Sequence, residues 1–126
     1  MARLLWICVA GAVGTAVRYL VGLAAARFVG TGLPLGTIAV NVVGCFLMSI
    51  VAAAGAKAII SPGTRLVLAT GFIGGLTTYS AFNWETLALA REGAWGVAEF
   101  YAALTLVACM ASGLLGLTLA RAAFGH

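Results

Sequence analysis

Long stretches without charge dominate this sequence and limit what it can fold into. Asp, Glu, Lys and Arg are absent from residues 28–56, 66–84 and 100–120, and Arg18 is the one charged residue within 4–26. A helix that crosses a bilayer needs about 20 mainly apolar residues. With 63% hydrophobic and 8% charged residues, the chain has too little polar surface to coat a soluble globule. The sequence therefore predicts an all-α integral membrane protein.

The connections between these stretches are short and rich in helix breakers. Glycine, proline, serine and threonine cluster at residues 30–34 and 61–64, where Pro62 suits the first position of a helix. We predict four membrane-spanning helices, at residues 3–27, 34–56, 63–90 and 95–121, within a single membrane domain covering residues 1–126. The first stretch ends at Ala26 without a small-residue cleavage site, so we expect no cleaved signal peptide.

The third predicted helix contains the segment G-F-I-G-G-L-T-T-Y-S-A-F, residues 71–82. Glycine costs about 1 kcal/mol relative to alanine in a helix interior, and threonine hydroxyls compete for backbone partners. We therefore predict that this helix is broken near its middle. Non-helical backbone occurs at membrane depth only where protein buries it or where it lines a polar cavity, so the break is a candidate functional site. Gly71 and Gly75 have a G-x-x-x-G spacing, which is more often a close helix contact than a binding feature.

Catalytic and metal-binding side chains are scarce. The acidic residues are Glu85, Glu92 and Glu99, and the one histidine is His126. The cysteines, Cys8, Cys45 and Cys109, show no metal-ligand or disulfide spacing. We therefore predict that the protein is not an enzyme. Its net charge of +4 is scattered along the chain, which argues against a nucleic-acid surface.

Several polar side chains recur at helical spacing on apolar helices. Asn41, Cys45 and Ser49 share one face of the second helix, and Tyr101, Thr105 and Cys109 share one face of the fourth. A buried asparagine can bind a ligand or bond a neighbouring helix. The hydroxyls can equally bond carbonyls of their own helix. Tyr79 and Phe82, which follow the predicted break, fit either a site or a core.

Arg18 and Glu85 are the charged residues nearest the membrane interior. An arginine at a helix centre costs about 2.5–3.5 kcal/mol on insertion scales, so Arg18 should face a partner, a wet vestibule or an interface. The remaining cations are distributed weakly in favour of the side that holds the N-terminus, the 57–65 region and the C-terminus: Arg3, Lys57, Arg65 and Arg121 against Arg27 and Arg91. Such a chain could insert in both orientations or as an ordinary protein with its N-terminus inside. No internal repeat is visible, so a site built from two halves would need a second subunit.

In combination, these motifs resemble those of the Fluc, or CrcB, family of fluoride channels. The resemblance rests on G-T-I-A-V-N-V-V-G at residues 36–44, on the 71–82 segment with Glu85 and Thr86 after it, and on G-T-A-V-R-Y at residues 14–19. It covers all four predicted helices. It implies an antiparallel, dual-topology homodimer in the bacterial inner membrane, with two pores that export fluoride passively.

The resemblance also implies roles for individual residues. Backbone carbonyls of Gly74 and Thr77 would hold a structural Na⁺ at the dimer centre. The fluoride pore would be lined by Asn41, Tyr79, Ser80, Phe82, Tyr101, Thr105 and Cys109. Arg18 and Glu85 would lie in a vestibule. The sequence departs from the usual family pattern at Tyr79, Ala81 and Cys109, where phenylalanine, threonine and serine are common.

Two other classes of protein fit the length and hydropathy of the chain. A small multidrug-resistance-type proton antiporter has four helices, but it needs a carboxylate embedded in its first helix, and no acidic residue precedes Glu85. A non-transporting membrane assembly subunit would explain the small-residue spacings but not a break rich in hydroxyl groups.

Overall fold

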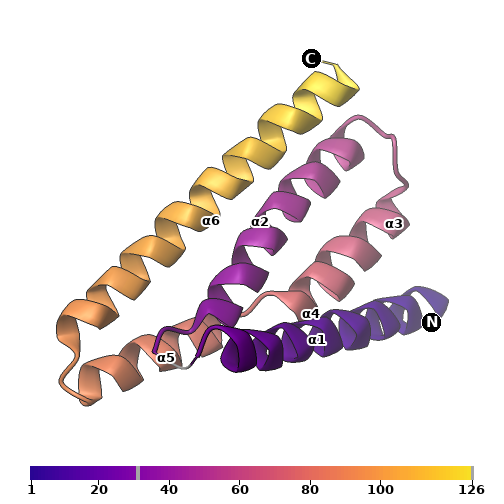
Figure 1. Cartoon of the computed structure of the whole chain (residues 1–126). Helices are drawn as coiled ribbons and strands as arrows, with labels where there is room; N and C mark the ends of the chain where they lie inside the picture. The colour runs from indigo at the N-terminus through magenta and orange to yellow at the C-terminus, as the bar shows by residue number, and fades with distance from the viewer. Residues whose placement is uncertain (31, 126) are drawn as a thin grey trace.

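Three long helices and one interrupted helix make up the computed structural model, which describes residues 1–30 and 32–125 (Figure 1). The long helices are α1 (Ala2–Phe28), α2 (Leu35–Ala56) and α6 (Trp95–Phe124). All three are long and apolar enough to cross a membrane. The predicted all-helical membrane architecture is confirmed. Thr31, in the first predicted connection, and His126 lie outside the described residues.

The third predicted helix is divided into four pieces. It consists of α3 (Pro62–Leu66), the π-helix η1 (Val67–Ile73), α4 (Gly74–Leu76) and α5 (Tyr79–Arg91). Ser61 begins the helix as its N-cap, since its hydroxyl accepts a hydrogen bond from the Thr64 N–H at 3.0 Å. The predicted break is therefore present, and the π-helix that precedes it is a feature that the sequence analysis did not predict.

Two threonines form the break. Thr77 and Thr78 have extended backbone angles, with ψ of 156° and 115°, whereas Gly74 and Gly75 remain helical. Thr78 then begins α5 as its N-cap, because its Oγ1 accepts a hydrogen bond from the Ala81 N–H at 3.1 Å. The sequence predicts that the glycines weaken the helix together with the threonines. In the structure the extended backbone angles lie at Thr77 and Thr78, while Gly71 lies in the π-helix η1.

The glycines instead allow helices to approach closely. A Cβ at Gly75 would collide with the carbonyl of Gly11 on α1, and a Cβ at Gly71 would lie 2.8 Å from the carbonyl oxygen of Ile7. Across the other helix pair, a Cβ at Gly116 would lie 2.6 Å from the Phe46 carbonyl oxygen. The Gly71/Gly75 spacing is therefore a packing contact. α1 packs along η1 and α4, and α2 packs along α6.

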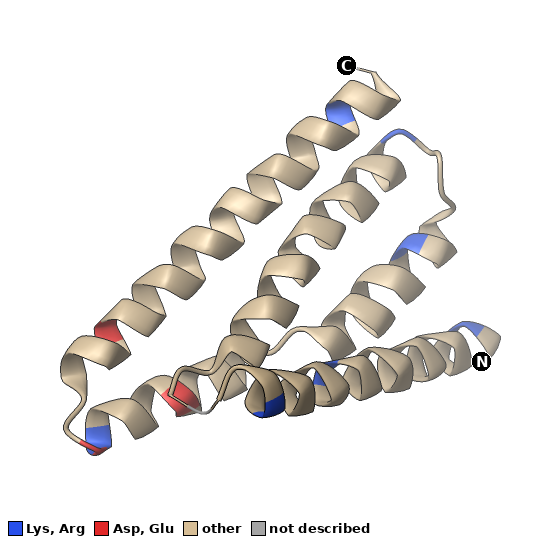
Figure 2. Ribbon diagram, viewed as in Figure 1, with Lys and Arg blue, Asp and Glu red and all other residues tan. Residues whose placement is uncertain are grey.

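The two ends of the molecule differ in charge. The N-terminus, the C-terminus and the connection from α2 to α3 lie at one end, where the charged residues coloured in Figure 2 are all basic. All three glutamates lie toward the other end, where α5 turns into α6. Gly93 makes that turn with a φ of +82°, which glycine adopts at little cost.

Candidate functional site

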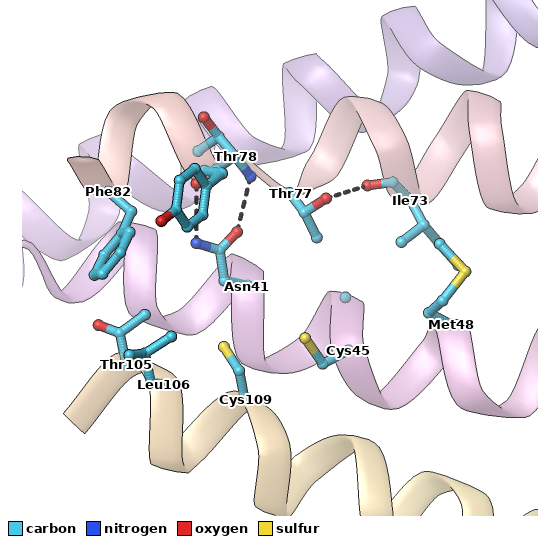
Figure 3. Close-up of a pocket in the computed structure, with 12 residues that line it drawn as sticks. Asn41, Cys45, Met48, Ile73, Thr77, Thr78, Phe82, Thr105, Leu106 and Cys109 are labelled. Atoms are coloured by element: carbon cyan, nitrogen blue, oxygen red, sulfur yellow. Dashed lines mark hydrogen bonds between the residues drawn. The ribbon is translucent and has the colours of Figure 1, made fainter. Parts of the chain in front are cut away.

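Asn41 on α2 holds the broken segment in place. Its Oδ1 accepts a hydrogen bond from the Thr78 N–H at 2.8 Å, and its Nδ2 donates to the Thr78 carbonyl at 3.1 Å (Figure 3). Asn41 and Thr78 are 9% and 8% exposed. A buried amide thus replaces the partners that the Thr78 backbone would have in a continuous helix. The predicted site residue is at the break, but most of its bonding capacity is used to maintain the break.

The break also removes the helical partners of two carbonyl groups. In a continuous α-helix, the Gly74 and Thr77 carbonyls would accept hydrogen bonds from the N–H groups four residues later, those of Thr78 and Ala81. Asn41 Oδ1 takes the first of these N–H groups and Thr78 Oγ1 takes the second. Gly74 and Thr77 are the two positions expected to ligate a cation through their carbonyls, and Gly74 lies exposed on the surface of the chain.

A cavity of about 310 Å³ lies between the break and helices α2 and α6. Five predicted pore residues line it: Asn41, Tyr79, Phe82, Thr105 and Cys109. The other lining residues are Gly44, Cys45, Met48, Ile73, Thr77, Thr78 and Leu106. Residues from segments far apart in the sequence thus come together in one place. None of the described residues that line this cavity is charged.

Ser80 and Tyr101 are not part of this lining. Ser80 is exposed, and its hydroxyl lies 3.2 Å from Thr78 Oγ1. Tyr101 is fully buried behind Phe82, with a distance of 5.5 Å between their ring centroids. The Phe82 and Tyr79 rings are also 5.5 Å apart, which makes a row of three aromatic rings. Tyr79, at the outer end of the row, is 76% exposed.

Hydroxyl groups surround the carboxylate of Glu85. Thr37 donates to Oε1 at 2.8 Å, and Tyr101 donates to Oε2 at 2.6 Å. Glu85 also lines a second cavity of about 230 Å³, which lies between α1, α2 and α5. Tyr101 therefore connects this carboxylate to the row of aromatic rings, two of which line the first cavity.

In the part of the chain that the structure describes, the side chains of Arg18 and Thr105 make no contact that singles them out as ion-binding groups. Arg18 is half-buried on α1 and lines neither of these cavities, and within the described residues it forms no ion pair with Glu85. Thr105 donates its hydroxyl to the Tyr101 carbonyl of its own helix at 2.8 Å. That self-bonding was one of the two alternatives open for the α6 hydroxyls. The Thr105 oxygen keeps its lone pairs for another donor.

Sequence reasoning missed two residues of the site. Thr37 lies one helical turn before Asn41 on the same face, so extending that stripe would have included it. Thr78 stands immediately before an amphipathic run, where a threonine is typical of an N-cap. The sequence contains both patterns. Neither assigns the threonine to the site until the residue that it bonds is known, which is Glu85 for Thr37 and Asn41 for Thr78.

Comparison with known proteins identifies the family of this chain. The family model described as "CrcB-like protein, Camphor Resistance (CrcB)" matches residues 5–117. The chain belongs to the CrcB family. The match includes every candidate residue from Arg18 on α1 to Cys109 on α6.

Curated CrcB relatives match over nearly the whole chain. A protein of Anaeromyxobacter dehalogenans is 43% identical over 122 residues, covering 96% of this chain and 97% of its own length. One from Sorangium cellulosum is 42% identical and covers 96% of both chains. One from Agrobacterium fabrum is 38% identical over 125 residues, or 98% and 100% of the two chains. Each of these relatives is named "Fluoride-specific ion channel FluC".

Proposed function

We propose that this protein is a passive, fluoride-selective channel that lets fluoride leave the cytoplasm. The observation that carries the proposal is the uncharged cavity at the helix break, in a chain that is 43% identical to a relative named as a fluoride-specific channel. The protein is thus a channel and not an enzyme.

The donors around the cavity suit a small, strongly hydrated anion. Such an ion must exchange its water for many modest donors without meeting a fixed cation that would trap it. Asn41 has one amide hydrogen beyond the one it gives to Thr78, and the rings of Tyr79 and Phe82 have electropositive edges. We infer that fluoride passes from the Glu85 cavity along the buried rings of Tyr101 and Phe82 to this cavity.

We further propose that two copies assemble antiparallel, with two pores per dimer, in the bacterial inner membrane. The chain leaves Tyr79 76% exposed at the edge of the cavity and Gly74 exposed beside the break. A second copy related by two-fold symmetry would cover these groups and complete the wall of each pore. The weak bias in the distribution of basic residues is compatible with insertion in both orientations.

The carbonyls freed at the break fit a structural Na⁺ at the centre of that dimer. Na⁺ is a hard cation, and backbone carbonyls are hard oxygen ligands. Gly74 and Thr77 would supply one pair of carbonyls from each subunit, since their helical donors are bound elsewhere. Unpaired carbonyls at membrane depth cost several kcal/mol each, so a shared cation would stabilise the break. When bound, the ion would supply positive charge near the two pores.

Efflux from liposomes tests the channel assignment. Vesicles that contain the purified protein and are loaded with both fluoride and chloride are treated with a potassium ionophore. A fluoride electrode should record release, whereas a chloride electrode should not. Protein-free vesicles and vesicles with heat-unfolded protein serve as controls. Equal release of the two ions, or fluoride release that occurs only with a proton gradient, would contradict a passive fluoride channel.

A further inference from the structure

The cavity at the break contains two thiols, and the fluoride pathway gives them no role as a pair. Cys45 on α2 and Cys109 on α6 both line it, and both are free and half-buried. Figure 3 shows the two thiols on the adjacent helices α2 and α6, and both side chains line the same cavity. The thioether of Met48 lines the same cavity one turn farther along α2.

The surroundings of the pair restrict what it could bind. Zn²⁺ prefers four ligands in a tetrahedron, and the described residues that line the cavity include no histidine or carboxylate to add to the thiols. Thiolate and thioether sulfur select soft metal ions. None of the described residues that line the cavity carries a charge that could balance a charged complex, so a complex without net charge is favoured.

We propose that Cys45 and Cys109 together form a binding site for a soft, two-coordinate metal ion, with Hg²⁺ as the ion that fits best. Each thiol gives up its proton as its sulfur bonds to the metal, so one Hg²⁺ and two thiols yield one neutral S–Hg–S unit and two protons. No electrons are transferred. The doubly charged ion balances two thiolates, whereas a singly charged soft ion would leave a buried negative charge.

A metal ion at this position would obstruct the cavity. Asn41, Phe82 and Thr105 line the same space as the two thiols. Binding of Hg²⁺ should therefore block fluoride efflux. This consequence depends on the proposed function, whereas the binding of the metal does not.

Direct binding is measured on the purified full-length protein with Cys8 replaced by serine. Cys8 is exposed on α1, lies outside the cavity and would otherwise add a third thiol. Mercuric nitrate is titrated into the protein alone, and metal–sulfur absorption and released protons are recorded; a separate titration in competition with glutathione compares the affinities of the variants. We expect one ion and two protons per chain. In that background, Cys45→Ser and Cys109→Ser should each weaken binding on the order of 100-fold, because the second bond of a chelate forms at high effective concentration.

If the Cys45→Ser and Cys109→Ser variants bind Hg²⁺ as tightly as the two-thiol protein, the cysteines act independently. That result would overturn the proposal. Monodisperse elution of each variant verifies that it is folded. In the efflux assay, Hg²⁺ should block the Cys8→Ser protein, and a dithiol should restore the flux. Tight binding of Hg²⁺ by both thiols without a block of fluoride efflux would support the metal site and contradict the proposed fluoride route. If Hg²⁺ blocks efflux equally after both cysteines are replaced, the result counts against the site.

Discussion

At the scale of single residues, Asn41 has a structural role at the helix break. Both polar atoms of its amide bond the backbone of Thr78, which is 37 positions away in the sequence. One amide hydrogen remains for the cavity. The two roles that the sequence left open, bonding a neighbouring segment and contacting an ion, are therefore compatible in one side chain.

Asn41→Ala should slow fluoride efflux strongly and lower the stability of the protein. The substitution leaves the buried N–H and carbonyl of Thr78 without hydrogen-bond partners. Each unsatisfied group lowers the free energy of unfolding by about 1–3 kcal/mol. Flux per unit mass of protein and thermal unfolding in detergent measure the two effects. Thr118→Ala is a matched control, because Thr118 is exposed and bonds only its own helix. If Asn41→Ala has the flux and stability of the wild type, the two hydrogen bonds from Asn41 to the Thr78 backbone are not needed.

At the scale of helices, the interrupted third span combines two structural features, a close glycine contact and a break at two threonines. Gly71 and Gly75 bring η1 and α4 against α1, and Thr77 and Thr78 end the helix directly afterward. Close packing on one side of the break and an amide clamp on the other hold the non-helical residues in place. The break is thus part of a rigid contact between helices, as non-helical backbone in a membrane requires.

Gly75→Ala should destabilise the fold by about 1–3 kcal/mol, the usual cost of overpacking. Its new methyl group would meet the backbone carbonyl of Gly11, which cannot move aside as a flexible side chain can. Resistance to unfolding in denaturing detergent gives the measurement. Gly22→Ala on α1 is the matched control, since nothing lies within 4 Å of the added methyl group. That variant should be as stable as the wild type or slightly more stable, because alanine is the better helix former. Equal stability of the two variants would contradict the close contact.

At the scale of the whole molecule, one end is basic and the other holds all three glutamates (Figure 2). In an antiparallel dimer, each membrane face would present one end of each kind. A reporter fused after the last residue should therefore appear in both compartments. Adding lysines to the α2–α3 connection should bias insertion toward one orientation and impair assembly. A reporter found on one side alone, with full channel activity, would refute dual topology.

Removal of Na⁺ should weaken the assembled channel. Exchange of Na⁺ for a large organic cation would leave the Gly74 and Thr77 carbonyls unpaired, so the dimer should dissociate at lower detergent concentration and efflux should fall. Returning Na⁺ should restore both. Variation of ionic strength with the organic cation alone controls for general salt effects. Dimer stability that is independent of Na⁺ would argue that another group pairs with these carbonyls.

The sequence by itself determined the membrane class, the approximate helix positions and the presence of a break. These follow from local properties, since the length and apolarity of a segment and its content of glycine and threonine act within one span. The motifs at residues 14–19, 36–44 and 71–86 together predicted the family, which the comparisons show.

Only the tertiary structure decided where the break falls and what each polar group bonds. Thr78 loses its helical geometry where Asn41 of another helix supplies both partners, and Glu85 is held by hydroxyls from α2 and α6. A buried polar group must find a partner, but which partner it finds depends on how helices distant in sequence pack together. Helical spacing places Asn41 and Thr37 on one face; the packing of α2 against the broken span decides what that face contacts.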